Sequence, residues 1–354
     1  MSQQLIFTND VATQLGRLIN AHTAGRVFVI ADDNTAHLVL PHLTRDCKYL
    51  ADAQIITISA GDTNKNIETV AHVWKQLSDN GATRSSLVVN IGGGMVTDLG
   101  AFAAATFKRG LRFINVPTTL LAAVDASVGG KTGFNFNGLK NEIGLFREAD
   151  AVIISTCFFN TLPVEELKSG YAEMLKHGFL TSADECNDLM STDITQIDTA
   201  RMLTLLERSV KVKRDIVTQD PTEQGIRRAL NLGHTAGHAF ESFAMAQNRP
   251  IPHGYAVAHG LLVALILSHM KAGLESSWLY KTASWIGNNY GTLPLTCDDY
   301  PTLLQYMSHD KKNESPDRIA FTLITAPGDV RCGVIITPSD ITAALDIYRD
   351  LLHM

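Results

Sequence analysis

Short apolar, β-rich runs alternate with helical patterns over the first half of the chain. Residues 66–81 carry apolar side chains at helical spacing up to Gly81, which predicts an amphipathic helix, and another helical stretch begins at Thr35. The runs predicted as strands are 26–32, 53–59, 86–94 and 112–119. Strands that alternate with helices in this way predict right-handed βαβ units and a mostly parallel sheet.

The second half has a different pattern. Helical periodicity dominates from about Leu162 to Tyr290, and two late β-rich runs, 319–325 and 333–337, predict a hairpin before a terminal helix. A chain of 354 residues also exceeds what one hydrophobic core usually supports. We therefore predict an α/β, Rossmann-like nucleotide-binding domain at residues 1–155 and a mainly α-helical domain at residues 156–354.

Composition and charge narrow the class of protein. Apolar residues make up 45% of the chain and charged residues 19%, and the net charge of −6 argues against a general nucleic-acid-binding surface. A local basic pocket for an anionic small molecule is still compatible with that charge. The most apolar run, 261–267, is too short to span a bilayer and predicts a buried helix. We expect neither a nucleic-acid nor a membrane partner.

Cysteine usage and the first residues indicate a compartment. The five cysteines are dispersed and form no CxxC pair, which favours reduced thiols over a disulfide framework or a thiolate zinc site. The opening MSQQLIFTND lacks a basic segment followed by an apolar one, so it predicts no signal peptide. We expect a cytoplasmic protein.

Three consecutive glycines, Gly92, Gly93 and Gly94, lie between a predicted strand and a predicted helix. Glycines there allow a diphosphate to approach the backbone closely, at a helix N-terminus that supplies N–H donors. The GxGxxG spacing is missing, so a tight turn that needs positive φ explains them equally well. Asp98 either stabilises the helix dipole or holds a cofactor hydroxyl or amide.

Two histidines, His234 and His238, each follow a glycine and project from one helix face at i, i+4 spacing. His253 follows in a proline-bounded loop, and Glu173 lies on a predicted helix with Lys176 at i+3. Two histidines and one carboxylate form a common catalytic zinc shell. Buried histidines with a structural role satisfy the same spacings, so spacing alone leaves both interpretations open.

Seven ordered segments of the chain resemble 3-dehydroquinate synthases, which are sugar-phosphate cyclases. TTLLAAVDASVGGKTG and LNLGHTAGHAFE are the most specific. The seven segments are GGGMVTDLGAFAAATFKRG, VPTTLLAAVDASVGGKTGFN, LKNEIGLF, SGYAEMLKHG, KVKRDIVTQDPTEQGIRRALNLGHTAGHAFE, HGYAVAHG and HDKKN. The resemblance implies an N-terminal Rossmann-like domain, a helical C-terminal domain and a phosphorus–oxygen lyase of the shikimate pathway for aromatic amino acids.

The resemblance also assigns residues. It implies that Glu173, His234 and His253 bind the metal and that His238 is an active-site histidine suited to phosphate contact and proton transfer. It implies a homodimer, because Arg109 matches an arginine that reaches the neighbouring subunit's site. The implied substrate contacts are Asp125, Lys131, Lys140, Asn141, Lys176, Lys213, Arg227, Asn231 and either Lys311 or Lys312. The implied NAD contacts are Asp62, Lys65, Gly92, Gly93, Gly94, Asp98, Thr118, Thr119, Lys131 and Lys140.

The implied reaction converts 3-deoxy-arabino-heptulosonate 7-phosphate to 3-dehydroquinate and phosphate. Zn²⁺ or Co²⁺ acidifies the C5 hydroxyl, NAD⁺ transiently oxidises C5, phosphate leaves by β-elimination, and re-reduction precedes intramolecular aldol closure. Lysine and arginine supply charge-assisted donors for the substrate carboxylate and phosphate, and asparagines suit its hydroxyls.

Four positions of the chain differ from the residues that are usual in the family, and three other functions compete with the synthase. Asp62 stands for a usual glutamate, Leu139 for a glycine, Ala126 for a serine and Ala236 for a larger apolar residue. The rivals are a valiolone- or inosose-type cyclase, a metal- and NAD-dependent polyol or glycerol-phosphate dehydrogenase, and a non-catalytic cofactor-binding protein. Retention of Lys213, Arg227 and Asn231 favours the dehydroquinate substrate.

Overall fold

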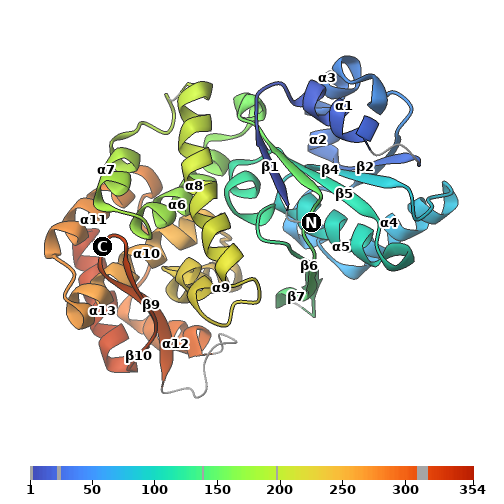
Figure 1. The fold of residues 1–354 in the computed structure, drawn as a ribbon. Helices are drawn as coiled ribbons and strands as arrows, with labels where there is room; N and C mark the ends of the chain where they lie inside the picture. The colour runs from blue at the N-terminus through green and yellow to red at the C-terminus, as the bar shows by residue number, and fades with distance from the viewer. Residues whose placement is uncertain (1–2, 22–24, 138, 197, 309–317) are drawn as a thin grey trace. The chain divides into compact units, whose positions relative to one another are not determined.

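The computed structural model describes residues 3–21, 25–137, 139–196, 198–308 and 318–354. Both alternatives for the HDKKN lysine, Lys311 and Lys312, lie outside these residues. The chain forms two compact units (Figure 1). Unit 1 comprises Met1–Pro163 and Asp198–Val210, and unit 2 comprises Val164–Ile197 and Lys211–Met354. The division into domains at residues 155 and 156 stays a prediction.

Unit 1 contains a six-stranded sheet whose described strand pairs are all parallel. Its order is β1-β8-β5-β4-β2-β3, from β1 (Gln4–Phe7), β2 (Val27–Asp32), β3 (Gln54–Ile58), β4 (Leu87–Gly92), β5 (Arg112–Pro117) and β8 (Ala151–Ile154). The four predicted strands and the parallel sheet are therefore confirmed. The two strands missed, β1 and β8, are the shortest of the six, at four residues each.

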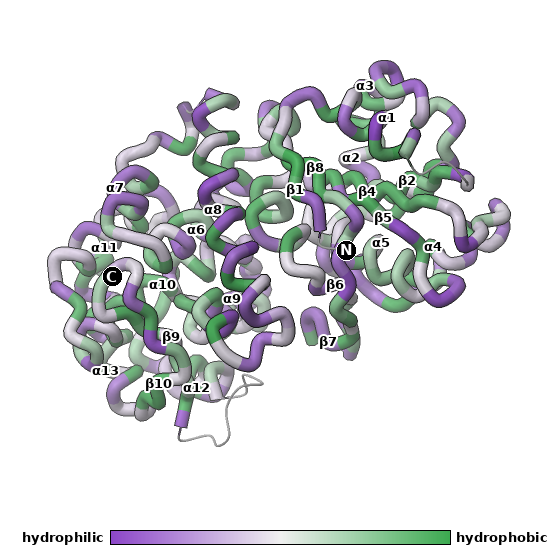
Figure 2. The backbone as a smooth tube through the Cα atoms, viewed as in Figure 1, coloured by the Kyte–Doolittle hydropathy of each residue, from purple (hydrophilic) through white to green (hydrophobic). Residues whose placement is uncertain are grey.

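Helices cover both faces of this sheet. Successive side chains of a strand point to opposite faces, so the helices that pack on Val89 and on Asn90 lie on opposite sides. On one face α1 (Val11–Ala21) and α3 (Leu40–Asp46) join a core that includes Val89 and Val116. α2 (Asp33–Leu38) follows β2, and α4 (Ile67–Asp79) packs beside α5 (Gly94–Thr106). The opposite face carries α5, where Gly100 leaves room for the buried amide of Asn90. Figure 2 shows the sheet as a hydrophobic centre.

The strand order contains a point at which the chain reverses direction across the sheet. From β2 the chain moves outward to β3, then returns to the other side of β2 as β4. In open α/β sheets, ligands bind beyond the carboxyl ends of the two strands that flank such a point. Here those ends are Asp32 and Gly92, so the triple-glycine segment begins where a nucleotide site is expected.

A second sheet of unit 1 was not predicted. β6 (Lys131–Phe136) and β7 (Leu139–Phe146) pair antiparallel in the segment that carries the family motifs GGKTG and LKNEIGLF. Gly133 and Gly144 allow the close approach, because a Cβ on Gly133 would lie 2.4 Å from the Ile143 carbonyl oxygen. Motif glycines hid the strand pattern, since glycine is depleted in strands.

Unit 2 is mainly helical, as predicted, and ends in the predicted hairpin and helix. Its helices are α6 (Val164–Phe179), α7 (Ala183–Ser191), the end of α8 (Thr199–Gln219), α9 (His234–Ala246), α10 (His253–Ala272), α11 (Ser276–Tyr290), α12 (Tyr300–Ser308) and α13 (Pro338–Leu351). β9 (Ile319–Ala326) pairs antiparallel with β10 (Asp329–Ile336). β10 begins four residues before the predicted start at residue 333, because the turn is confined to Pro327 and Gly328.

Helix α10 contains the apolar run 261–267. By length and composition it could cross a membrane, but 72% of its most apolar window is buried inside the protein. A core helix has that property, which agrees with the predicted buried helix.

Candidate active site

The two glycines that precede His234 and His238 let helices α9 and α10 approach closely. A Cβ on Gly233 would lie 2.8 Å from the Leu261 backbone nitrogen, and one on Gly237 would lie 3.0 Å from the Ala256 carbonyl oxygen. From the other helix, a Cβ on Gly260 would lie 2.1 Å from the Gly233 carbonyl oxygen. The glycines therefore fix the distance between the helix that begins with His234 and the helix that begins with His253.

Helix α6 meets the start of α10 in the same way. A Cβ on Gly254 would lie 1.8 Å from the Ser169 carbonyl oxygen, and the Gly254 amide donates to the Ser169 hydroxyl at 3.0 Å. Glu173 lies one turn after Ser169 on α6, and His253 directly precedes Gly254. Glycine at position 254 thus brings Glu173 and His253 together.

Glu173, His234 and His253 converge on one point. One ligand atom from each lies within 4.8 Å of the others. Oε1 of Glu173 is 3.4 Å from Nε2 of His234 and 3.6 Å from Nε2 of His253. Both oxygens of Glu173 are buried without a hydrogen-bond partner, although Lys176 forms an ion pair with Oε2. A buried carboxylate without hydrogen-bond donors is costly unless a cation compensates it.

The charges around this group are strongly coupled. Burial alone would raise the pKa of Glu173, but the Lys176 ammonium and His234 hold that pKa well below 4.5. Burial lowers the pKa of His234, and Lys176 lowers it further. Burial opposes protonation of His253 as well, but Glu173 and Glu241 raise its pKa to about 10. The carboxylate is thus ionised, and the two carboxylates favour a positive charge at His253.

His238 lies one turn beyond His234 on the same helix and is exposed. Its ring centroid is 5.3 Å from that of His234 and 6.0 Å from that of His253. The structure therefore brings all three predicted histidines into one group, with His238 on its solvent side. Ala236, one of the family departures, is fully buried in α9.

The buried cations in the described part of the chain are all predicted site residues. Lysine and arginine are almost never fully buried unless paired. Within the described residues, the lysines and arginines that are less than 9% exposed are Lys65, Lys176, Lys213 and Arg227. Three of these, Lys176, Lys213 and Arg227, belong to unit 2.

A turn before α9 orders two further predicted residues. Arg227 donates from its backbone to the Asp220 carboxylate at 3.0 Å and from its guanidinium to the Pro221 carbonyl at 2.6 Å. Asn231 donates to the Glu223 carboxylate at 2.9 Å. Glu223 was not identified from the sequence. It lies eight residues before Asn231, and this spacing gave no sign that the two side chains are in contact.

Glu241 was also missed. It is 7% exposed on α9, and its Oε2 is 3.3 Å from Nδ1 of His253. Its position at i+7 from His234, two turns along the same helix face, was the available signal.

In unit 1 the triple-glycine segment forms a cradle at the start of α5. A Cβ on Gly92 would lie 2.5 Å from Val96, and one on Gly93 would lie 3.1 Å from Thr119. None of the three glycines has positive φ, so the tight-turn interpretation is wrong, and close approach explains Gly92 and Gly93. Gly93 caps α5 without a side-chain hydrogen bond. The first N–H groups of this helix are therefore not capped by a side chain.

Lys65 joins two predicted residues beside this cradle. Its Nζ is 2.6 Å from Oδ2 of Asp98 and 2.5 Å from Oδ1 of Asn141. Asp62 is linked to the same hairpin, since its carboxylate lies 3.3 Å from Nζ of Lys140 and 3.3 Å from the Asn135 amide. Five residues that were assigned to the cofactor or substrate thus lie in one network, and the shorter Asp62 still reaches Lys140.

The remaining predicted residues of unit 1 lie around the same segments. Thr118 is buried and donates its amide to the Gly92 carbonyl at 2.9 Å, and the Thr119 hydroxyl accepts from Ala122. Asp125 is partly buried in a π-helical turn at Ala122–Ala126, and Lys131 is exposed at the start of β6.

Unit 1 also contains Arg109 and two of the positions that differ from the family pattern, Ala126 and Leu139. Ala126 is 3.4 Å from the position of a Cβ on Gly94, so it packs at the cradle. Leu139 is 55% exposed on β7. Arg109 is exposed in the 3-10 turn Phe107–Arg109 and has a φ of 70°.

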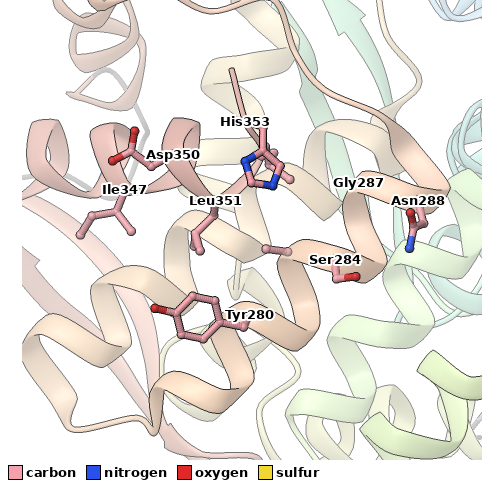
Figure 3. Close-up of a pocket in the computed structure, with 10 residues that line it drawn as sticks. Tyr280, Ser284, Gly287, Asn288, Ile347, Asp350, Leu351 and His353 are labelled. Atoms are coloured by element: carbon pink, nitrogen blue, oxygen red, sulfur yellow. The ribbon is translucent and has the colours of Figure 1, made fainter.

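A surface pocket in unit 2 contains none of the predicted residues. It lies between α11 and the end of α13, and Figure 3 shows Tyr280, Ile347 and His353 at its wall. Its lining includes Asp350 and His353 but no group of two histidines and a carboxylate like that at Glu173.

Two adjacent family models match most of the chain. The model described as 3-dehydroquinate synthase N-terminal matches residues 55–169, and the one described as 3-dehydroquinate synthase C-terminal matches residues 170–313. The chain belongs to the 3-dehydroquinate synthase family. It is 45% identical over 348 residues to a 3-dehydroquinate synthase from Parabacteroides distasonis, which covers 98% of each chain. The resemblance stated from the motifs is confirmed.

Solved structures share the fold across nearly the whole length. A 2-deoxy-scyllo-inosose synthase complexed with carbaglucose-6-phosphate, NAD⁺ and Co²⁺ matches with a TM-score of 0.85 and 21% identity, covering 98% of this chain and 96% of that one. A 2-epi-5-epi-valiolone synthase from Streptomyces hygroscopicus with NAD⁺ and Zn²⁺ bound matches with a TM-score of 0.83 and 26% identity, covering 99% and 97%. The predicted fold class of this 3-dehydroquinate synthase family member is confirmed.

Proposed function

We propose that the chain is a metal- and NAD-dependent 3-dehydroquinate synthase that converts 3-deoxy-arabino-heptulosonate 7-phosphate to 3-dehydroquinate and phosphate. The observation that carries this proposal is the convergence of Glu173, His234 and His253 in a chain that belongs to this family along most of its length. The buried cations Lys176, Lys213 and Arg227 support an anionic substrate.

The residues present fit a divalent metal. Two imidazole nitrogens and one carboxylate oxygen are donors that Zn²⁺ and Co²⁺ both accept. Glu173 presents two buried oxygens with no hydrogen-bond partner, which a cation would satisfy. When bound by Glu173, His234 and His253, the metal would polarise substrate hydroxyls and make them more acidic.

The residues of unit 1 fit a dinucleotide. Gly92 and Gly93 leave room for a diphosphate against the start of α5, whose N–H groups favour an anion. The pair of Lys65 and Asp98 lies beside this cradle and can bind polar groups of the cofactor. When bound there, NAD would accept a hydride from the substrate and return it.

The chain's own side chains bind the substrate, orient its hydroxyls and exchange protons with it. Lys176, Lys213 and Arg227 supply charge for the substrate's carboxylate and phosphate, and burial makes each contact stronger than it would be in water. Asn231 is held by Glu223 and can orient a hydroxyl. His238 is exposed beside the metal group, so it can exchange a proton with solvent and with a phosphate at that site.

The experiment that tests this function measures released phosphate and net NADH in the same reaction. Metal-loaded protein receives NAD⁺ and the heptulosonate phosphate, while released phosphate and absorbance at 340 nm are recorded. Phosphate release without net NADH supports the synthase, because the cofactor is regenerated in each turnover. Net NADH would instead establish a dehydrogenase, and the absence of both signals would refute this substrate.

We propose further that the protein acts in the cytoplasm as a homodimer. Arg109 supports the dimer because it is an exposed cation at a position where the family places an arginine that serves the neighbouring subunit. Mixing the inactive variants Arg109→Ala and His253→Ala tests it. Random subunit exchange in an equal mixture makes about half of the dimers mixed, and each mixed dimer has one intact site of two, so the mixture should recover about a quarter of wild-type turnover. No recovery would refute the shared site.

A further inference from the structure

The imidazole of His253 lies between two carboxylates from different helices. Its Nε2 is 3.6 Å from Oε1 of Glu173 on α6, and its Nδ1 is 3.3 Å from Oε2 of Glu241 on α9. A carboxylate only accepts hydrogen bonds, so the Nδ1 contact requires a proton on that nitrogen. The proton on Nδ1 leaves Nε2 of the neutral ring as the nitrogen with a free lone pair.

His234 is oriented by the same principle with a different acceptor. Its Nδ1 lies 3.2 Å from the carbonyl oxygen of Leu232, and its Nε2 faces the same Glu173 oxygen. Both histidines therefore have an acceptor on Nδ1 and direct Nε2 to one point. Acceptors of this kind fix the tautomer and the ring orientation of metal-binding histidines.

His253 depends on its acceptor more than His234 does. The side chain of His253 is 28% exposed, whereas that of His234 is 12% exposed. A partly exposed ring has more freedom to rotate about its side-chain bonds, and Glu241 is the side-chain anchor on its outer nitrogen. Glu241 is itself only 7% exposed, so its side chain has little room to move away from His253.

We propose that Glu241 is a positioning residue, which holds His253 with Nε2 directed at the metal site and supplies a negative charge beside it. A metal can bind His253 only when the proton on Nε2 has left, so both histidines are neutral in the metal-binding state. Glu173 and Lys176 then compensate each other, and Glu241 gives the cluster a net charge of −1 that favours a divalent cation. This inference rests on the proposed function, because it requires that the trio binds a metal.

The test measures zinc affinity by competition with a chromophoric chelator, on the full-length protein. Glu241→Ala removes both the acceptor and the charge, and we expect the dissociation constant to rise 10- to 100-fold. Glu241→Gln keeps an acceptor of the same length, so a smaller rise of about threefold to tenfold is expected. Glu275→Gln is the matched control, because Glu275 is exposed at the start of α11 in the same unit.

The Co²⁺-substituted proteins give a readout that a loss of fold stability alone would not move. The visible absorption bands of Co²⁺ report its ligands, so they should shift or weaken in Glu241→Ala, shift less in Glu241→Gln and stay unchanged in Glu275→Gln. Far-ultraviolet circular dichroism of the metal-free variants checks that the helices are intact. If Glu241→Ala does not fold, the isosteric Glu241→Gln decides by the same two measurements.

Three results would be decisive. Weakened zinc binding with an altered Co²⁺ spectrum in the Glu241 variants supports the proposal. Wild-type affinity and spectrum in these variants would overturn it while leaving the proposed metal site in place. Failure of the wild-type protein itself to bind zinc, with no difference from His253→Ala, would overturn the metal site and this proposal together.

Discussion

The contact between Gly254 and Ser169 predicts that a single added methyl group can separate two of the proposed metal ligands. In Gly254→Ala the new Cβ would start 1.8 Å from the Ser169 carbonyl oxygen, whereas ordinary van der Waals contact begins at 3.4 Å. The start of α10 must therefore move away from α6 by about 1.6 Å if α6 stays fixed. His253 precedes the substituted residue and moves with it.

The size of the effect follows from this displacement. Nε2 of His253 lies 3.6 Å from Oε1 of Glu173, so the shift increases that distance to about 5 Å when it is directed away from α6. Overpacking costs about 1–3 kcal/mol, and the higher helix propensity of alanine offsets up to about 1 kcal/mol of it. We expect the free energy of unfolding to fall by up to about 3 kcal/mol. Zinc affinity should fall by at least about tenfold, which is about 1.4 kcal/mol of binding free energy.

The assay compares Gly254→Ala with Gly287→Ala. Gly287 is also a helical glycine of unit 2, on α11 (Figure 3). The atom nearest to its added Cβ would be 3.7 Å away. Gly287→Ala should keep wild-type zinc affinity and be as stable as wild type or up to about 1 kcal/mol more stable. Urea unfolding and zinc competition measure both quantities. Zinc affinity of Gly254→Ala within twofold of wild type would refute the role of this close contact.

Three further predictions concern the same sites. His253→Ala should abolish metal retention and turnover, and an active variant without metal by atomic absorption would contradict the ligand assignment. In the metal-free protein the pKa of His253 is raised to about 10, so its protonation stabilises the fold fully below about pH 6.5, and this stability is lost as pH rises through 10. Urea unfolding from pH 6.5 to 10 should therefore show a steeper loss of stability in the wild type than in His253→Ala, and equal slopes would count against the two carboxylates as its cause. Lys65→Met should weaken NAD binding at least about tenfold by calorimetry, because it leaves Asp98 and Asn141 without their shared donor, whereas Lys75→Met on the exposed face of α4 should leave it unchanged.

The sequence by itself determined the alternation of strands and helices and most of the candidate residues. Strands β2 and β4 were predictable because each is mostly apolar and buried along its length, as is typical of a strand covered on both faces. Family motifs named the candidate metal ligands Glu173, His234 and His253 and the four cations that are buried among the described residues. The spacing of His234 and His238 predicted one helix face, since residues four apart lie one turn apart.

Only the tertiary structure decided how these residues are used. His259 lies on the same helix as His253, yet it is fully buried with Nδ1 2.8 Å from the Tyr348 hydroxyl, and burial lowers its pKa to about 3. Such a histidine has the structural role that spacing could not distinguish from metal binding. The difference arises because His253 faces two carboxylates from other helices, and contacts between distant segments are not encoded in local periodicity.

The glycines show the same limit. Sequence alone could not tell whether Gly92, Gly93, Gly233 or Gly237 served turns or close approaches, because both uses require the absence of a side chain. In the structure Gly92, Gly93 and Gly237 do not have positive φ, and a Cβ on each would contact neighbouring atoms too closely. These three glycines therefore serve close approaches. Glu241 escaped prediction for a related reason. Its partner is twelve residues away across a loop, and only the packing of α9 against α10 brings the two side chains together.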